Sequence, residues 1–238
     1  MSNQKEQIAR FEFKYVLDPV TVIRVRDFIE SVGLEHDRNT PVNPYTVTSL
    51  YFDSVGLDDY YDKAGGFLVR KKVRIRAYAS ALHHDLLDLY FEIKNKHDMF
   101  ISKDRAVISK KEWEHIVEGN FRGLFPLFDY YLFREGRVPT VIVRYEREAF
   151  DAWFYGRVRL TFDKHIEAIR PDASLTGDDL WYDATPVSGP MTVMEVKFAK
   201  RLPWWFLVMV EKFGLERVAY SKYAHAVDAL YRYNPLPR

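Results

Sequence analysis

The sequence of 238 residues contains no cysteine. This absence excludes disulfide scaffolds, thiolate zinc sites and thiol nucleophiles, and it is compatible with a reducing compartment, so we expect a cytoplasmic protein. Neither a P-loop motif nor a Rossmann glycine motif occurs, so the sequence gives no support to these two nucleotide-binding architectures. Any phosphate chemistry must therefore come from another kind of site.

Long hydrophobic runs are also lacking, because no stretch approaches the roughly 20 apolar residues that a membrane span needs. The longest candidate is LPWWFLVMV at 202–210, which runs directly into Glu211 and Lys212. We expect this segment to begin a buried helix. A membrane-surface anchor is the alternative, since aromatic-rich apolar patches also dock to lipid.

The composition is that of a folded protein. Hydrophobic residues make up 47% and aromatic residues 16% of the chain, which excludes a disordered polypeptide. The net charge is only +1, from 35 basic and 34 acidic residues. A function that depends on charge must therefore arise from segregation of the two signs within the fold.

Alternation of polar and apolar residues is the dominant pattern, and it is typical of strands, where neighbouring side chains point to opposite faces. In VRKKVRIRAY at 69–78, Arg, Lys, Arg and Arg occupy every second position, with apolar residues between the last three. Seven other segments also read as strands. The eight expected strands are RFEFKY at 10–15, YTVTSLYFD at 45–53, VRKKVRIRAY at 69–78, YFEIKNK at 90–96, SKDRAVI at 102–108, VRYEREAF at 143–150, RVRLTFD at 157–163 and VMEVKF at 193–198.

Helices are fewer. Asp18 as N-cap and Pro19 at the first helical position predict a helix that runs to about Val32 and ends at Gly33. Three further helices are expected at 110–118, 203–214 and 220–233. No internal repeat or linker is evident, so we expect a single domain over residues 1–238.

The charges of the seven charged strands are sorted onto one face. An ordinary solvated sheet face mixes both signs, because opposite charges stabilise neighbouring strands. The excess of ten cations on this face instead predicts an anionic ligand lying against it. The fourteen cations are Arg10, Lys14, Arg70, Lys72, Arg74, Arg76, Lys94, Lys96, Lys103, Arg105, Arg147, Arg157, Arg159 and Lys197, and the four anions are Glu12, Glu92, Asp163 and Glu195.

An antiparallel sheet of this size can close into a barrel whose interior holds one ligand. We therefore expect an α+β fold built on a closed antiparallel eight-stranded barrel, with a cationic interior and helices packed on the outside. Arg and Lys suit phosphate oxygens, and the few carboxylates suit Mg²⁺ or Mn²⁺. Phosphoryl transfer requires little more than positioned cations and a metal, so the face predicts a nucleotide or polyphosphate site.

Ordered motifs give the chain a family resemblance. RFEFKY, YFD at 51–53, RKKVRIRAY, FEIKNK, SKDR, YEREAF, RLTFD, MEVKF and SKY at 221–223 occur in this order. In these motifs, from about Arg10 to Tyr223, the chain resembles the VTC-type polyphosphate polymerase domain, one of the triphosphate tunnel metalloenzymes and a relative of the CYTH phosphatases and cyclases. The resemblance implies an eight-stranded tunnel that transfers the γ-phosphoryl group of ATP to a growing polyphosphate chain. ATP, pyrophosphate or polyphosphate would be the substrates, with Mn²⁺ or Mg²⁺ as cofactor.

The resemblance also implies roles for individual residues. Ala219 stands where eukaryotic members have a lysine, and Arg10 stands where CYTH enzymes have the first acid of E-x-E-x-K, which favours a transferase. Glu195 would hold the metal, with Glu12 and Glu92 as weaker candidates because each lies near lysines. The expected catalytic residues are Lys14, Arg74, Arg76, Lys94, Lys103, Arg147, Arg159 and Lys222, and the expected substrate-binding residues are Tyr145 and Ser221, with Arg70, Lys72, Lys96, Arg105 and Lys197 added by their place on the cationic face.

Two alternatives to a polymerase stay open. One is a CYTH-type tunnel hydrolase of triphosphate or nucleotide, and the other is a non-catalytic polyphosphate-binding module. Nucleic acid is disfavoured as a partner, because most aromatic residues lie opposite the cations, where they could not stack on bases. Any association with a membrane is expected to require a separate membrane-protein partner.

Overall fold

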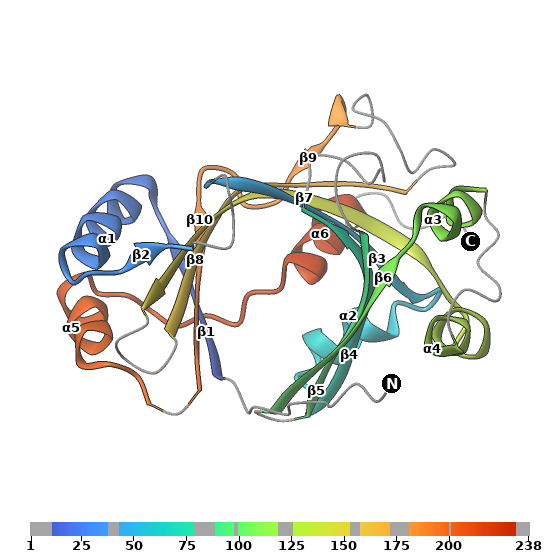
Figure 1. Ribbon diagram of the computed structural model, residues 1–238, viewed down its shortest axis with the longest axis horizontal. Coiled ribbons are helices and arrows are strands. Elements are labelled where there is room, and N and C mark those ends of the chain that lie inside the picture. The colour runs from blue at the N-terminus through green and yellow to red at the C-terminus, as the bar shows by residue number, and fades with distance from the viewer. Residues whose placement is uncertain are drawn as a thin grey trace.

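The structure is a computed structural model that describes residues 11–37, 43–78, 89–97, 100–118, 126–152, 158–171, 181–199 and 201–231. One antiparallel sheet dominates it, and all eight expected strands are present (Figure 1). They are β1 (Phe11–Leu17), β3 (Tyr45–Ser54), β4 (Val69–Ala77), β5 (Leu89–His97), β6 (Phe100–Ile108), β7 (Arg137–Ala152), β8 (Val158–Ile169) and β10 (Thr192–Phe198), while β2 (Glu35–His36) and β9 (Thr185–Pro186) are two short additions.

The sheet is curved but is not closed by hydrogen bonds, so the expected closed barrel is not confirmed. The strand order is β1-β10-β8-β7-β3-β4-β5-β6, and within the described residues no ladder joins β1 to β6. Part of the β1 edge is instead occupied by the segment before the last helix, because the Val218 backbone N–H donates to the Lys14 carbonyl (2.8 Å). Side chains bridge the gap, since Lys94 on β5 donates to Glu12 on β1 (2.8 Å).

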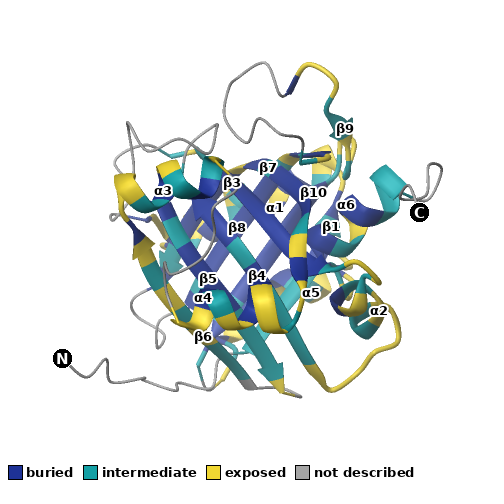
Figure 2. Ribbon diagram, turned by 90° about the vertical axis from the view of Figure 1, so that its right-hand side faces the viewer, coloured by how far each residue is buried: buried dark blue, intermediate teal, exposed yellow. Residues whose placement is uncertain are grey.

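Most of the helices cover the outer face of the sheet in two groups (Figures 1 and 2). The helix predicted from Asp18 is present, with the Asp18 carboxylate accepting from the Val20 and Thr21 N–H groups. The expected helices at 110–118, 203–214 and 220–233 are also present, whereas α2, α4 and η1 were not expected. The helices are α1 (Pro19–Ser31), α2 (Asp58–Ala64), α3 (Lys110–Val117), α4 (Pro126–Asp129), a π-helical turn η1 (Tyr130–Arg134), α5 (Trp204–Lys212) and α6 (Lys222–Tyr231).

The outer face of the sheet packs against most of these helices. α1 and α5 cover β1, β8 and β10, where Val25 and Trp205 are fully buried. α3, α4 and η1 cover β3 to β6, where Ile116 and Phe128 are fully buried. The apolar residues between the cations of β4, such as Ile75, belong to this second core. Alternation therefore predicted the outer face correctly.

Two helices, α2 and α6, depart from the expectation that all helices pack outside. Tyr60 of α2 packs against the same inner core as Tyr223 of α6, and Lys63 of α2 lines the inner face. α6 lies within the curve of the sheet (Figure 1). Its Tyr223, Ala226 and Val227 pack with Val47 and Val193, which lie on the face of the sheet that carries the cations. This end of the inner face is apolar, so it accepts an apolar helix. α6 thereby confines the cationic region to the rest of the inner face.

No helix in the described part of the chain is long and apolar enough to cross a membrane. The segment 202–210 contains the start of α5 (Trp204–Lys212), so the helix expected there is present. Trp205 and Phe206 are buried in the outer core, whereas Trp204 and Leu207 are exposed.

Candidate active site

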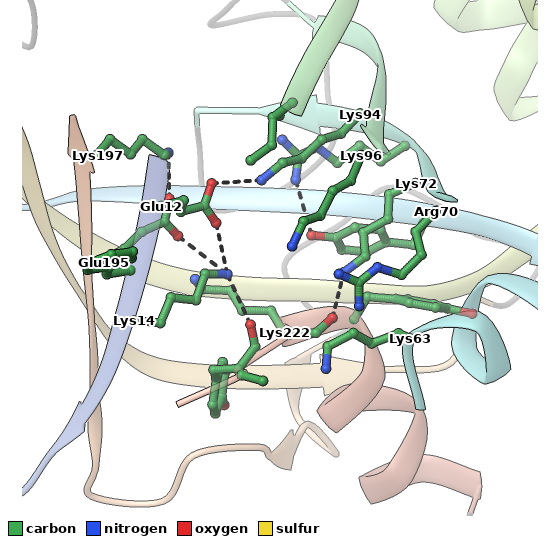
Figure 3. Close-up of a pocket in the computed structure, with 18 of the residues that line it drawn as sticks. Glu12, Lys14, Lys63, Arg70, Lys72, Lys94, Lys96, Glu195, Lys197 and Lys222 are labelled. Carbon is green, nitrogen blue, oxygen red and sulfur yellow. Dashed lines mark hydrogen bonds and ion pairs between the residues drawn. The ribbon is translucent and has the colours of Figure 1, made fainter. Parts of the chain in front are cut away.

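The inner face of the sheet encloses a cavity of about 450 Å³ beside the start of α6. Its described lining contains thirteen Lys or Arg residues and only three Asp or Glu residues. Lys14 and Lys197 project into it from β1 and β10, and Arg70, Lys72 and Lys94 project from β4 and β5 (Figure 3). The cations that alternation assigned to one face of the sheet thus surround one cavity, and the lining of this cavity is strongly positive.

Most of the residues expected at the site lie together here. They come from strands far apart in the sequence and from the start of α6, because the curvature of the sheet brings its inner face around one space (Figure 3). The expected residues that line the cavity are Glu12, Lys14, Arg70, Lys72, Arg74, Arg76, Lys94, Lys96, Tyr145, Arg147, Glu195, Lys197, Ser221 and Lys222.

Glu92 on β5 is the carboxylate with which Arg74 and Arg76 of β4 pair. It is fully buried, and its carboxylate accepts from Arg74 (2.9 and 2.7 Å) and Arg105 (2.8 Å) and pairs with Lys103. Burial raises the pKa of Glu92, but Arg74, Arg76 and Lys103 outweigh this effect and hold the pKa well below its usual value. Because cations surround it, Glu92 is poorly placed to bind a metal ion.

Lys14 lies between Glu12 and Glu195, two of the three acidic residues of the cavity lining. Its ammonium is 3.1 Å from Glu12 and 3.6 Å from Glu195, and Lys197 is 2.5 Å from Glu195. Burial lowers the pKa of Lys14, but the two carboxylates raise it further than burial lowers it. Burial raises the pKa of Glu12 and of Glu195, but the nearby lysines lower both pKa values by more than burial raises them. The lysines thus stabilise the anionic form of both glutamates.

The opposite side of the cavity has cations without acidic partners. Lys72 donates to the hydroxyl of Ser221 (2.6 Å), and in the described part of the chain no carboxylate lies within ion-pair distance of Lys72, Arg70 or Lys63. Burial, followed by the charges of Lys14 and other cations, lowers the pKa of Lys72 well below its usual value. Burial and nearby Arg70 also lower the pKa of Lys63. Such a group of half-buried cations is suited to an anionic ligand.

The start of α6 is anchored by a buried carboxylate. Asp163 on β8 accepts from Arg147 (2.6 and 2.8 Å) and pairs with Lys222. Burial raises the pKa of Asp163, but Arg147 and Lys222 lower it overall. The ammonium of Lys222 also lies 4.6 Å from the ring centre of Tyr145. Asp163 thus fixes two of the expected phosphate ligands.

Four expected residues lie outside the cavity lining. Lys103, Arg105 and Glu92 form the ion-pair group behind it. Arg159 instead pairs with Asp37, and its guanidinium lies 4.0 Å from Asp151. Sequence spacing could not predict these partners, because they depend on how the strands and loops meet. Arg10 and Arg157 lie outside the described residues.

The structure also adds lining residues that the strand pattern missed. Lys63 comes from α2, and Arg217 comes from the segment before α6, with its guanidinium 4.0 Å from the ring centre of Phe13. Neither is on a strand, so alternation could not identify them. Tyr51 was missed on β3, a strand without cations, although its hydroxyl accepts from Arg74 (3.3 Å). Ala219 also lines the cavity.

Two carboxylates of the cavity fit a divalent cation whose other ligands are phosphate oxygens of the substrate and water. Glu12 and Glu195 are the cavity carboxylates whose partners are lysines, which can move toward an added anion. Mg²⁺ is commonly held by one or two carboxylates, with water and substrate phosphates completing its octahedron. In the described residues, no group of three or more acidic or histidine side chains forms a metal cage. The two glutamates therefore suit a metal that arrives with its substrate.

Comparison with solved structures relates the fold to known proteins. A putative adenylyl cyclase from Hippeastrum, described as having a dominant triphosphatase activity, has a TM-score of 0.53 and 12% identity, with 91% of this chain and 93% of that chain covered. A putative adenylate cyclase from Bacillus halodurans has a TM-score of 0.50 and 12% identity, with 88% and 94% covered. At this identity the likeness shows a shared fold.

Comparison of sequences identifies the family. Subunit 4 of the vacuolar transporter chaperone complex from Schizosaccharomyces pombe is 23% identical over 95% of this chain and 38% of its own length, so the chain spans less than two fifths of that relative. The model of the VTC domain matches residues 9–231, which include every element that builds the cavity. The resemblance seen in the ordered motifs is thereby confirmed, and the chain belongs to the VTC domain family.

Proposed function

We propose that the chain is a metal-dependent phosphotransferase that moves the γ-phosphoryl group of ATP to a growing polyphosphate chain in the cationic cavity. The observation that carries this proposal is the group of half-buried cavity cations Arg70, Lys72 and Lys63, which have no acidic ion-pair partner among the residues that the structure describes. Membership of the VTC domain family supports the same reaction. An extended polyanion is the ligand whose charge such a lining would balance.

The arginines would hold the phosphates of the donor. Arg74 and Arg76 are supported from behind by Glu92, and Arg147 by Asp163, so their guanidinium groups are oriented before substrate binds. Oriented cations stabilise the charge of the transferring phosphoryl group without reorganising during the reaction. Positioning of the two reacting phosphates would supply the remaining rate enhancement.

Glu12 and Glu195 would hold the divalent cation, Mn²⁺ or Mg²⁺, together with phosphate oxygens. When bound, such an ion supplies charge neutralisation at the phosphates. Lys14 lies between the two glutamates, so it would keep them correctly placed when no cation is bound.

The protonation states favour a phosphate acceptor over water. The terminal oxygen of a polyphosphate is already ionised, so its attack needs no proton acceptor. Attack by water releases a proton, and Glu12 and Glu195 already pair with the ammonium groups of Lys14, Lys94 and Lys197, which makes them poor proton acceptors. This difference supports a transferase rather than a hydrolase of the CYTH type.

The reaction products test the proposal. Purified protein would be incubated with ATP and Mn²⁺, and the products resolved on a polyacrylamide gel stained for polyphosphate. The expected result is a ladder of polyphosphate, with one ADP released for each phosphate incorporated. Orthophosphate without polymer would favour the triphosphatase activity described for the Hippeastrum neighbour. Tight polyphosphate binding without any turnover would favour a binding module.

The cellular setting is part of the same proposal. The relative from Schizosaccharomyces pombe is named as a subunit of a complex, and this chain spans 38% of its length. We propose that the chain acts in the cytoplasm and reaches a membrane through a separate membrane-protein partner. Co-purification of the tagged protein with the membrane fraction, and its release when that partner is deleted, would test this.

A further inference from the structure

Three tyrosines continue the inner face of the sheet beyond the cavity lining. Tyr78 follows Arg76 by two positions at the end of β4, and Tyr90 precedes Glu92 by two positions on β5. Tyr45 begins β3. Because residues two apart in a strand share a face, Tyr78 and Tyr90 point to the same side as the phosphate-site arginines. This end of the inner face is therefore aromatic.

The tyrosines form one connected group. The ring centres of Tyr45 and Tyr78 are 6.1 Å apart, and those of Tyr78 and Tyr90 are 6.0 Å apart with the rings at 73°. The guanidinium of Arg105 lies 4.0 Å from the ring centre of Tyr90 and donates to the Tyr78 hydroxyl (2.8 Å). We call these four residues the aromatic mouth. The three tyrosines are half-buried and Arg105 is exposed, so the group is accessible to a ligand.

The aromatic mouth is coupled directly to the phosphate site. Arg105 donates to one oxygen of Glu92 (2.8 Å), and Arg74 donates to the other oxygen (2.7 Å). The mouth and the cavity thus share a carboxylate. At a strand rise of about 3.3 Å per residue, Tyr78 is about 7 Å from Arg76 along the strand. If the phosphates of a ligand lie at Arg76, the group attached to these phosphates would reach the aromatic mouth.

The chemistry of the mouth differs from that of the cavity. A tyrosine ring presents a negative face, which gives a phosphate chain no attraction. A nucleobase, in contrast, stacks on aromatic rings and on guanidinium planes regardless of its sequence identity. The opposite end of β4 carries Arg70 and Lys72, which suit phosphate.

We propose that the aromatic mouth binds the base of a nucleoside triphosphate whose phosphates lie at Arg74 and Arg76. This inference rests on the proposed function, which identifies ATP as the phosphoryl donor. It also specifies how the nucleotide is oriented along β4. The nucleoside enters at the Tyr78 end of β4, and the phosphate chain extends toward Arg70 and Lys72 at the other end. Donor and polymer therefore occupy opposite ends of the cavity.

Removal of single rings tests this subsite. The affinities of Tyr78→Leu and Tyr90→Leu for ATP and for inorganic triphosphate would be measured by calorimetry in EDTA, so that no turnover occurs. We expect each variant to lose about tenfold in ATP affinity while inorganic triphosphate changes by less than about twofold. Tyr90→Phe, which keeps the ring, should recover most of the ATP affinity that Tyr90→Leu loses. Tyr182→Leu, at a side chain that is 87% exposed, is the control that should bind ATP normally.

Two results would overturn the subsite. Equal losses for ATP and inorganic triphosphate would mean that the rings only support the cavity, and unchanged ATP affinity would mean that no base binds there. The polyphosphate gel separates this inference from the proposed function. An ATP-selective loss in a protein that makes no polymer supports the subsite and contradicts the polymerase. Normal ATP affinity of Tyr90→Leu in a protein that does make polymer contradicts the subsite alone.

Discussion

Arg74 donates two hydrogen bonds to the same carboxylate oxygen of Glu92, from Nε at 2.9 Å and from Nη2 at 2.7 Å. The guanidinium of this cavity arginine is therefore held by an acid that is itself fully buried. Removing one partner of a buried ion pair is far more harmful than removing a surface pair, because the remaining charge stays buried. Glu92 thus joins the stability of the fold to the orientation of its phosphate ligands.

Glu92→Gln keeps the shape of the side chain but leaves Arg74 and its neighbours without their anion. We expect the free energy of unfolding to fall by about 3 kcal/mol. Inorganic triphosphate should restore part of this loss, because a bound polyanion stabilises the folded state. Urea unfolding with and without triphosphate measures both effects. Glu167→Gln, which removes the half-exposed partner of Arg144 (3.0 Å), should cost less than about 1 kcal/mol. Equal midpoints for the two variants would contradict the prediction.

Lys72→Met removes a half-buried cation that has no acidic ion-pair partner in the described residues. Relief of its repulsion with Lys14 and Lys94 should leave the free protein as stable as the parent or more so. The affinity for inorganic triphosphate should fall about tenfold, because a charge-assisted contact is lost. Thermal unfolding and calorimetry give the two quantities. Lys111→Met, at an exposed position of α3, should change neither. A Lys72 variant that is less stable but binds triphosphate normally would show that the lysine is structural.

Binding of a polyanion should take up protons. Burial lowers the pKa of Lys103 to about 7, against the pull of Glu92, and burial also lowers the pKa values of Lys72 and Lys94. A bound phosphate chain raises these pKa values, so triphosphate affinity should fall as the pH rises above about 7. The binding heat would be measured by calorimetry in two buffers of different ionisation enthalpy, at about pH 8.5, where the phosphates of the ligand are ionised. The difference between the two heats gives the number of protons taken up on binding. Equal heats in both buffers would rule out the uptake.

The same lysines give the free protein a pH dependence of known sign. Lys103 has a folded pKa below its unfolded value, so the folded state binds fewer protons than the unfolded state between about pH 7 and about pH 10. The contribution of Lys103 to the free energy of unfolding should therefore rise with pH in this window. Urea unfolding of Lys103→Met and of the parent across the window would show it. A difference between the two proteins that is constant with pH would contradict the assignment.

Glu195→Gln should separate metal-dependent from metal-independent binding. Loss of the carboxylate leaves Lys14 and Lys197 without this partner, so the affinity for triphosphate in EDTA should stay the same or increase. Mn²⁺ should no longer strengthen binding, and polymer formation should fall by at least about 100-fold. Binding measured with and without Mn²⁺ and the gel assay test these outcomes. Full activity in the variant would exclude Glu195 as the metal-holding residue, and Glu167→Gln again provides the surface control.

The strand pattern determined much of this protein from the sequence alone. Alternation places every second side chain on one face, so Arg74 and Ile75 could be assigned to opposite sides before any contact was known. All eight expected strands are present, and the Asp18 and Pro19 signals correctly predicted the start of α1. These features are local, since each depends on residues a few positions apart.

The remaining features were decided only by tertiary structure, because they depend on residues that are distant in sequence. Glu92 is one acid among several in the sequence, and only the register of β4, β5 and β6 gathers cations around it. An amphipathic helix pattern does not say which face of a sheet it meets, so the placement of α6 inside the curve could not be predicted. The same applies to Lys63 on α2 and to the β1 edge, where Val218 takes the position that a closed barrel would give to a strand. Periodicity specifies the face of each element, whereas curvature and register determine which charges meet.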